Sequence, residues 1–331
     1  MRYPLADWIN QHSDVPHNLA LSGMVGELRT TEEALVPSHP ATSPEVTERL
    51  SEILNVGSDR IFLTHGGTES NVSVLLFLAR RVRKDHHRRS RLRIVPPEFL
   101  PTAEGAWAIG YAPAKGTSAD VYALSQPNNP SGGAVPAEEL AKRSEGVSAT
   151  LVDETFREFT TTRSAAEADR PGRWVTGSLT KAYGADRVRV GYVVAPSQDR
   201  DAFGPFLSLV LDELPTASAG QALALLDRRE AILGESRSRF QTNLEELRRR
   251  IPDAPSLAAP VWFDTAIEPR DGRAFARNAL EAGVLVCPGV FFGTPRGVRV
   301  CLTRRTFPTA LNAYLGVRRA AAPPRRIRVA R

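Results

Sequence analysis

The amino-acid sequence predicts an α/β fold, in which a large domain with a mostly parallel sheet is followed by a smaller α+β domain. Two observations carry this prediction. Short apolar runs alternate with helical stretches through the first two thirds of the chain, which is typical of strands joined by crossover helices. After Pro215 the pattern changes to a long amphipathic stretch followed by a few strands and helices. The length of 331 residues also suits about two domains.

The domain boundaries follow from this change of pattern. We expect residues 36–215 to form the large domain, with helices on both faces of its sheet, and residues 216–331 to form the small C-terminal domain. Residues 1–35 have no evident place in the sheet, so this N-terminal segment is expected to pack with the small domain.

The large domain begins with a helix and a strand that lead to a glycine turn. Pro44–Leu54 has helical periodicity, Ile61–Leu63 is typical of a short strand, and a helix is expected from Glu69 onward. A further helix is expected at Ala137–Arg143. Strands are expected at Leu92–Val95, Ala106–Tyr111, Val121–Ser125, Ala149–Asp153, Trp174–Ser178 and Val188–Ala195.

The small domain begins with the amphipathic stretch Ala217–Arg250. Its later elements are short and alternate in type. They are strands near Val261–Phe263, Val284–Cys287 and Val298–Leu302, with helices around Arg273–Ala282 and Phe307–Val317.

Composition excludes several classes of protein. Hydrophobic residues at 42% and charged residues at 24% are ordinary globular values, which excludes wholesale disorder. The longest apolar stretch, Val74–Ala79, is far shorter than the ~20 residues of a membrane span. The N-terminus shows no secretory signal, so we expect a cytoplasmic protein with no membrane partner. Cys287 and Cys301 are too few for a disulfide scaffold or a four-cysteine zinc site, and no metal site is expected.

The net charge of +6 comes from an excess of arginine. Basic runs at Arg80–Arg93 and Arg325–Arg331 leave open a non-catalytic protein that binds nucleic acid. Neither run interleaves aromatic side chains with its charges as single-strand binders do, so we expect no nucleic-acid partner. Where arginine is the usual cation, a retained lysine indicates a need for an amine that can lose its proton. The lysines are Lys84, Lys115, Lys142 and Lys181.

Two turns follow predicted strands and suit ligand binding. The first, His65-Gly66-Gly67-Thr68-Glu69, opens a helix, where backbone N–H groups and the helix dipole favour an anion such as phosphate. It lacks the Gly-Lys-Ser/Thr of a P-loop, and a tight strand-to-helix turn is the alternative. The second, Asn128-Asn129-Pro130-Ser131-Gly132, places amides at the carboxyl end of a strand, the usual ligand side of an α/β sheet. Its alternative is a plain proline and glycine turn.

Two further segments carry ionisable groups. The strand Leu151–Asp153 ends in a carboxylate that points into the same crevice, where a protonated ring nitrogen is a suitable partner. A helix N-cap or a buried ion pair is the alternative for Asp153. In Ser178-Leu179-Thr180-Lys181, the lysine follows two hydroxyls and precedes Arg189 by eight residues. A partly desolvated lysine near other cations becomes an amine nucleophile, whereas the alternative is a surface lysine.

In this order and spacing, the four motifs resemble those of the class I and II aminotransferases over roughly residues 44–310. The resemblance implies the fold of the pyridoxal 5′-phosphate (PLP) transferases of fold type I, with PLP as cofactor and a homodimer as the assembly. Lys181 matches the lysine that forms a Schiff base (aldimine) with PLP and moves the substrate proton, and Asp153 matches the partner of the pyridine nitrogen. The remaining cofactor-binding matches are Gly67, Thr68, Phe99, Asn129, Ser178, Thr180 and Arg189.

The same resemblance supplies substrate contacts. Arg299, in the stretch Gly297-Val298-Arg299-Val300, is expected to bind the substrate α-carboxylate, next to Asn129. Ser22 and Gly23 lie in a segment similar to the one that closes over substrate in the family. Small-molecule amino acids and 2-oxo acids are therefore the expected partners.

Two departures from the family pattern bear on the reaction. Phe156 stands where the family commonly has a tyrosine that contacts the cofactor oxygen, and no tyrosine lies between Arg29 and Glu48 to reach a neighbouring subunit's phosphate. His39 is a candidate substitute for the latter. The sequence predicts an aminotransferase that moves the amino group of an α-amino acid to a 2-oxo acid. A PLP-dependent lyase, decarboxylase, cyclase or oxidase on the same fold is the alternative.

Overall fold

The computed structural model describes residues 4–35 and 40–320. His39 and Arg325–Arg331 lie outside the described residues. The helices of the described part are α1 (Pro4–Gln11), α2 (Arg29–Ala34), α3 (Ser43–Leu54), α4 (Gly67–His86), α5 (Leu100–Ala108), α6 (Ala137–Arg143), α7 (Arg200–Val210), α8 (Thr216–Asp227), α9 (Arg229–Arg250), α10 (Gly272–Glu281) and α11 (Phe307–Ala320). Its strands are β1 (His17–Asn18), β2 (Ile61–Thr64), β3 (Arg91–Arg93), β4 (Ala112–Pro113), β5 (Val121–Ser125), β6 (Ala149–Asp153), β7 (Arg173–Ser178), β8 (Gly191–Val194), β9 (Val261–Asp264), β10 (Val284–Leu285), β11 (Cys287–Pro288) and β12 (Val298–Cys301).

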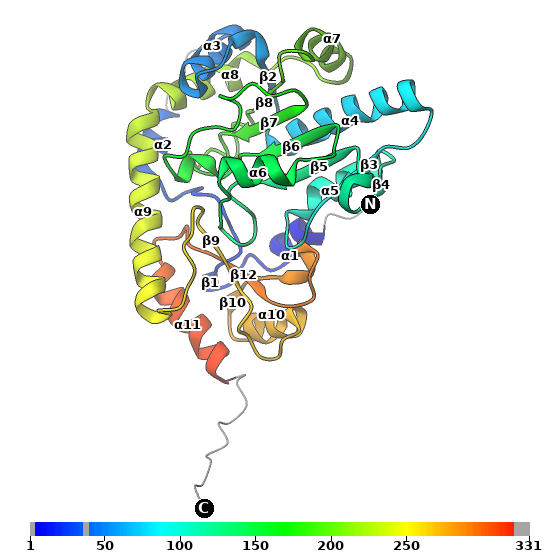
Figure 1. Cartoon of the computed structure of the whole chain (residues 1–331). Coiled ribbons are helices and arrows are strands. Elements are labelled where there is room, and N and C mark those ends of the chain that lie inside the picture. The colour runs from blue at the N-terminus through cyan, green and yellow to red at the C-terminus, as the bar shows by residue number, and fades with distance from the viewer. Residues whose placement is uncertain (1–3, 36–39, 321–331) are drawn as a thin grey trace, which may run out of the picture.

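A seven-stranded sheet forms the centre of the molecule, in the order β2-β8-β7-β6-β5-β3-β4 (Figure 1). The strands from β7 to β4 are parallel neighbours, and β8 is antiparallel to both β7 and β2. The predicted α/β fold with a mostly parallel sheet is therefore confirmed. Because the parallel strands point the same way, the loops after β5, β6 and β7 leave one edge of the sheet together.

Helices cover both faces of this sheet because its central strands are apolar on both sides. Along β5, Val121 and Ala123 face a core shared with α4, α5 and α7, whereas Tyr122 and Leu124 face a core shared with α3, α6 and α8. This alternation follows the two-residue period of a strand. The apolar run Val121–Leu124 within β5 therefore reflects a strand that is buried on both faces.

The C-terminal part of the described chain holds two small sheets. One is antiparallel, in the order β11-β12-β9, and the other pairs β1 with β10 in parallel. The N-terminal segment thus lies against the C-terminal part, and Leu5 of α1 packs in one apolar cluster with Phe292. Helix α8 packs against α3 beside the large sheet. The division into domains at residues 35 and 215 stays a prediction.

Most predicted elements are present, and one prediction is wrong. Ala106–Tyr111 was expected to form a strand, but it contains the end of α5 and the turn that follows. Ala103 and Ala106 are three residues apart and both are buried in the core that α5 shares with α4, as on one face of a helix. Alanine has the highest helix propensity, so this apolar run favours a helix. The stretch Ala217–Arg250 forms two helices, α8 and α9.

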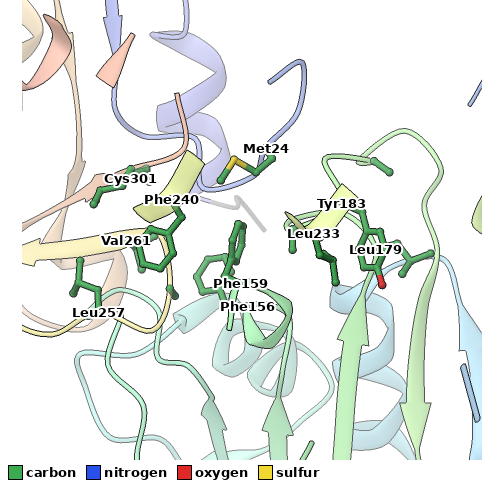
Figure 2. Close-up of a cluster of buried hydrophobic side chains, with 14 of the residues drawn as sticks. Met24, Phe156, Phe159, Leu179, Tyr183, Leu233, Phe240, Leu257, Val261 and Cys301 are labelled. Atoms are coloured by element: carbon green, nitrogen blue, oxygen red, sulfur yellow. The ribbon is translucent and has the colours of Figure 1, made fainter. Parts of the chain in front are cut away.

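Aromatic contacts join the large sheet to the long helix α9. Phe156 and Phe159 follow β6 and pack edge to face with ring centroids 6.0 Å apart. Phe159 in turn meets Phe240 of α9 at 6.3 Å, in the cluster that Figure 2 shows. This packing fixes the loop after β6, and with it the end of the strand that carries Asp153.

Several arginines of the basic run Arg80–Arg93 have partners within the fold. Arg81 pairs with Asp199 at 2.8 Å, and Arg88 pairs with Asp120 at 2.6 Å. The guanidinium of Arg93 lies 4.3 Å from the ring centroid of Tyr122. These contacts explain three of the charges as parts of the structure. Among the described helices, none is long and apolar enough to cross a membrane.

Candidate active site

A cavity of about 190 Å³ opens at the carboxyl ends of β5, β6 and β7. Every residue predicted for the site except Gly23 lines it. These are Ser22, Gly67, Thr68, Phe99, Asn129, Asp153, Ser178, Thr180, Lys181, Arg189 and Arg299. Sequence segments far apart along the chain therefore meet at the one sheet edge where their motifs predicted a ligand.

The glycine turn at the start of α4 forms one wall. Gly66 has φ of +109°, a backbone conformation that favours glycine, and a Cβ atom there would also displace Nη2 of Arg189, which lies 2.5 Å from that position. The first N–H groups of a helix have no acceptor within the helix, and Gly67 and Thr68, the first two residues of α4, line this wall. The turn is thus open to an anion at the positive end of a long helix.

Three side chains complete the anion-binding wall. The hydroxyl of Ser178 lies 2.9 Å from that of Thr180, and both residues are buried at the end of β7. Arg189 adopts a left-handed backbone with φ of +54°, and its Nη2 donates to the carbonyl of His65 at 3.1 Å. Two hydroxyls, one guanidinium and the helix N–H groups together form a donor set suited to a phosphate.

Asp153 lies at the end of β6 with its carboxylate held in place. The oxygen Oδ1 accepts the N–H of Thr155 at 2.9 Å, and Oδ2 accepts Nδ2 of Asn71 at 2.8 Å. Asn71 is itself oriented by Thr176, whose hydroxyl donates to Oδ1 at 2.6 Å. The carboxylate is buried and lines the cavity, and a positively charged ring nitrogen is the kind of group that such a carboxylate accepts.

Three polar residues that line the cavity were not predicted from the sequence: Asn71, Ser125 and Thr155. Asn71 could have been predicted, because it lies four residues after Gly67 and so one helical turn further along α4. A polar residue on a buried helix face needs a partner. Ser125 and Thr155 gave no such signal, since a hydroxyl at a strand end is common in any fold.

Lys181 lies among cations in a mostly enclosed setting. Burial lowers the pKa of its ammonium below the ordinary value of 10.5, and the positive charge of Arg299 lowers this pKa further. The carbonyl of Lys181 accepts the N–H of Met24 at 3.0 Å, so the N-terminal segment crosses directly over this loop. A Cβ atom at Gly23 would lie 3.4 Å from Cδ of Lys181. Gly23 thus contacts the lysine stem rather than the cavity.

Asn129 and Arg299 are joined across the cavity. Nη1 of Arg299 donates to Oδ1 of Asn129 at 3.0 Å, and Nη2 donates to the carbonyl of Ala20 at 2.7 Å. Since a guanidinium can only donate, the atom of Asn129 that faces it must be the oxygen. The amide nitrogen of Asn129 is therefore the donor available on the cavity side. The aromatic ring of Phe292 lies 5.1 Å from the Arg299 guanidinium and fixes it from another side.

Apolar side chains form the rest of the wall. Phe99 precedes α5, and Phe156 occupies the position of the usual tyrosine, so that no described tyrosine lines the cavity. Helix α1 contributes Leu5 and Ile9, which were not predicted as site residues. Trp8 of α1 donates its indole N–H to the carbonyl of Val286 at 2.9 Å, which holds this helix in place.

The residues present fit PLP in each of its polar parts. The anion-binding wall suits the phosphate, Asp153 suits the protonated ring nitrogen, and the amide of Asn129 suits the ring oxygen. Lys181 supplies an amine with a lowered pKa. The fold and this donor set define a PLP enzyme of fold type I.

Comparison with known proteins gives the family. Residues 95–313 match the family described as aminotransferase class I and II. An aromatic amino acid aminotransferase of Rhodococcus erythropolis is 35% identical over 177 residues, which cover 49% of this chain and 47% of that protein. A histidinol-phosphate aminotransferase of Halorubrum lacusprofundi is 28% identical over 293 residues, which cover 80% of this chain and 76% of that protein. The matched part spans about half the length of the first relative.

The fold comparison agrees with the sequence comparison. A crystal structure of a PLP-dependent aminotransferase from Streptococcus suis superposes with a TM-score of 0.80 at 19% identity, covering 98% of this chain and 99% of that one. At this identity the likeness establishes the fold alone. The family match covers about two thirds of the chain. The chain belongs to the class I and II aminotransferases, which are PLP-dependent enzymes.

Proposed function

We propose that this protein transfers the amino group of an α-amino acid with an apolar side chain to a 2-oxo acid. The observation that carries the proposal is the cavity that brings Lys181, Asp153 and Arg299 together beside an apolar wall. When bound, PLP supplies an electron sink for the bond that breaks at the substrate α-carbon.

Each polar residue has a distinct task in this proposal. Arg299 binds the substrate α-carboxylate and orients the α-carbon toward Lys181. With PLP bound, Lys181 would take the proton from the substrate α-carbon and give it back during transfer, and the burial and the Arg299 charge that lower its pKa favour the neutral amine needed for this. Asp153 holds the ring nitrogen in its protonated form. Asn129 contacts both the ring oxygen and Arg299, so it couples the cofactor position to the carboxylate position.

The apolar substrate class follows from the charges that line the cavity. Its described cations are Lys181, Arg189 and Arg299, and each already has a task in the proposal. Leu5 and Ile9 of α1 face the same space. A second carboxylate or a phosphate on the substrate would be desolvated there without a cation of its own, which is costly.

A substrate screen tests this proposal. We expect the PLP-loaded enzyme to convert L-phenylalanine or L-leucine with a kcat/KM about 100-fold above that for L-aspartate, an amount in the range for an unpaired buried charge. Formation of the 2-oxo acid is the measurement. The variant Ile9→Arg should shift this preference toward aspartate, whereas Asn10→Arg, on the exposed side of the same helix, should leave it unchanged. A wild-type preference for aspartate or histidinol phosphate would refute the apolar class.

The same screen separates transfer from the other PLP reactions. Transfer requires a 2-oxo acid acceptor for turnover. Steady release of CO₂, ammonia or peroxide without an acceptor would instead identify a lyase, decarboxylase or oxidase. The named aminotransferases among the relatives favour transfer.

We also propose that the protein acts as a homodimer. Leu209 and Val210 at the end of α7 expose 77% and 42% of their surfaces, beside a groove that α3, β2 and α7 line. A second copy covering this face would bury them. Sedimentation velocity should give twice the 36.1 kDa of one chain. Leu209→Glu should produce monomers, whereas Val95→Glu, at an exposed valine elsewhere, should not. A monomeric wild type would contradict this. The cytoplasmic location stays a prediction.

A further inference from the structure

Glu98 is a buried acid beside the active site to which the reaction assigns no task. It precedes Phe99 and is only 4% exposed. Its side chain does not line the cofactor cavity, but it borders a small void together with Asp153, Phe99 and Ser125. A carboxyl group this deeply buried needs partners, and these partners show what the group does.

Four donors surround the Glu98 carboxyl, two at each oxygen. Oε1 accepts the N–H of Phe99 at 2.7 Å and the hydroxyl of Ser125. Oε2 accepts the N–H of Ser125 at 3.1 Å and Nδ2 of Asn128 at 3.0 Å. An ionised carboxylate offers only acceptors and satisfies all four donors. A protonated carboxyl has a hydrogen of its own, so it keeps all four neighbours only if the Ser125 hydroxyl turns round and accepts that hydrogen.

This cluster is linked to the groups that face cofactor and substrate. The hydroxyl of Ser125 donates to Glu98 and accepts the N–H of Asn129 at 2.8 Å. The side-chain oxygen Oδ1 of Asn129 in turn accepts a hydrogen bond from Nη1 of Arg299 at 3.0 Å. On its other side, Glu98 holds the backbone of Phe99, whose ring lines the cavity. One carboxylate therefore connects two cavity walls.

We propose that Glu98 is a positioning residue whose ionised form holds Asn129 and Phe99 in place for PLP, so that cofactor binding depends on the protonation of Glu98. This inference rests on the proposed function. In the neutral acid, either the Ser125 hydroxyl turns round and accepts the Glu98 hydrogen, or one of the N–H donors of Phe99, Ser125 and Asn128 is released. Either change alters the link to Asn129 or the position of Phe99.

The surroundings place this protonation near neutral pH. Burial and, less strongly, the charge of Asp153 on β6 raise the pKa of Glu98, whereas the hydrogen bonds from Ser125 and Phe99 lower it, and together they leave this pKa at about 7. Tyr122 on β5 also faces this group. Because the folded pKa lies above the ordinary 4.5, burial makes ionisation of Glu98 cost the folded apo protein stability, so the contribution of Glu98 to stability is greatest at low pH. This stabilisation is lost as the pH rises from 4.5 to about 7. PLP binding should strengthen over the upper part of that window.

The test compares Glu98→Gln with Glu104→Gln, a matched change on α5 that removes none of the four contacts. PLP is titrated into each full-length apo protein between pH 5.5 and 8.5, followed by absorbance and tryptophan fluorescence. We expect PLP to bind Glu98→Gln about 10-fold more weakly at pH 8, the value of one hydrogen bond, and without the wild-type change near pH 7. The phosphate of PLP also titrates in this pH range, but it does so equally in all variants, so a difference between variants comes from the protein. Thermal unfolding of the apo proteins should be measured at several pH values. The stability that Glu98 contributes at low pH should be absent in Glu98→Gln and retained in the wild type and in Glu104→Gln.

A double-mutant cycle shows whether Glu98 acts through Asn129. In an Asn129→Ala background, Glu98→Gln should weaken PLP binding clearly less than it does in the wild type. If Glu98→Gln fails to fold, Ser125→Ala breaks the same link and should give the same loss. The inference is overturned if Glu98→Gln matches Glu104→Gln in affinity and pH profile, or if its effect is undiminished in the Asn129→Ala background. A wild-type protein that binds no PLP would instead overturn the proposed function.

Discussion

Replacing Lys181 with alanine is expected to lower kcat/KM by about 10⁴-fold, because the variant has no amine to move the proton at the substrate α-carbon. Lys181→Arg should be equally inactive, since an arginine of similar reach keeps its proton at any working pH. The measurement is 2-oxo acid formation under saturating PLP. Agreement between the two variants would show that the site needs an amine that can lose its proton, and not merely a positive charge.

A lysine elsewhere supplies the control. Lys84 lies on the exposed part of α4, and Lys84→Ala should retain wild-type activity. Retention of more than about a tenth of the activity in Lys181→Ala would assign the proton transfer to another group, because such a small loss is below the usual contribution of a general base.

Replacing Arg299 with lysine is expected to lower kcat/KM by about 100- to 1,000-fold, mainly through a higher KM for the amino acid. Arg299→Lys keeps one positive charge but loses the planar pair of donors that fits a carboxylate. The expected size corresponds to about 3–4 kcal/mol, within the range for removing one partner of a buried charged contact. Steady-state kinetics with varied amino acid and saturating PLP gives the split between KM and kcat.

The position of Arg299 in β12 makes a folding control necessary. It is only 2% exposed and contacts Asn129, Ala20 and Phe292, so unfolding of the apo variant should be measured beside its kinetics. Arg296→Lys changes an exposed arginine in the same segment and should leave KM unchanged. A folded Arg299→Lys variant with the wild-type KM would remove Arg299 from the proposed carboxylate site.

Much of the fold was predictable because its central strands are buried on both faces. The predicted ranges Val121–Ser125 and Ala149–Asp153 coincide with β5 and β6, since a short, mostly apolar segment between turns is typical of a buried strand. The sheet then places the ends of these strands at one edge, so motifs in separate loops converge. Short apolar segments that contain alanine do not distinguish a strand from a helix, and the prediction of a strand at Ala106–Tyr111 was wrong for this reason.

The site was predictable where a residue type was itself unusual in its position. A lysine in an arginine-rich chain, paired glycines before a helix, and a carboxylate at the end of an apolar strand are all visible in one segment. Contacts between segments are not. Asn71 lies 82 residues from the Asp153 that it orients, and α1 reaches the cavity only because β1 pairs with β10. The role of Glu98 likewise depends on donors that come from another loop.

The most direct test of the account is to find where the cofactor attaches. The PLP-loaded protein is reduced with borohydride, digested and analysed by mass spectrometry of its peptides. We expect a pyridoxyl phosphate group on Lys181 and none on the same peptide of unreduced protein. Attachment at Lys84, Lys115 or Lys142 instead, or no attachment with excess PLP, would contradict the assignment of this cavity as a PLP site.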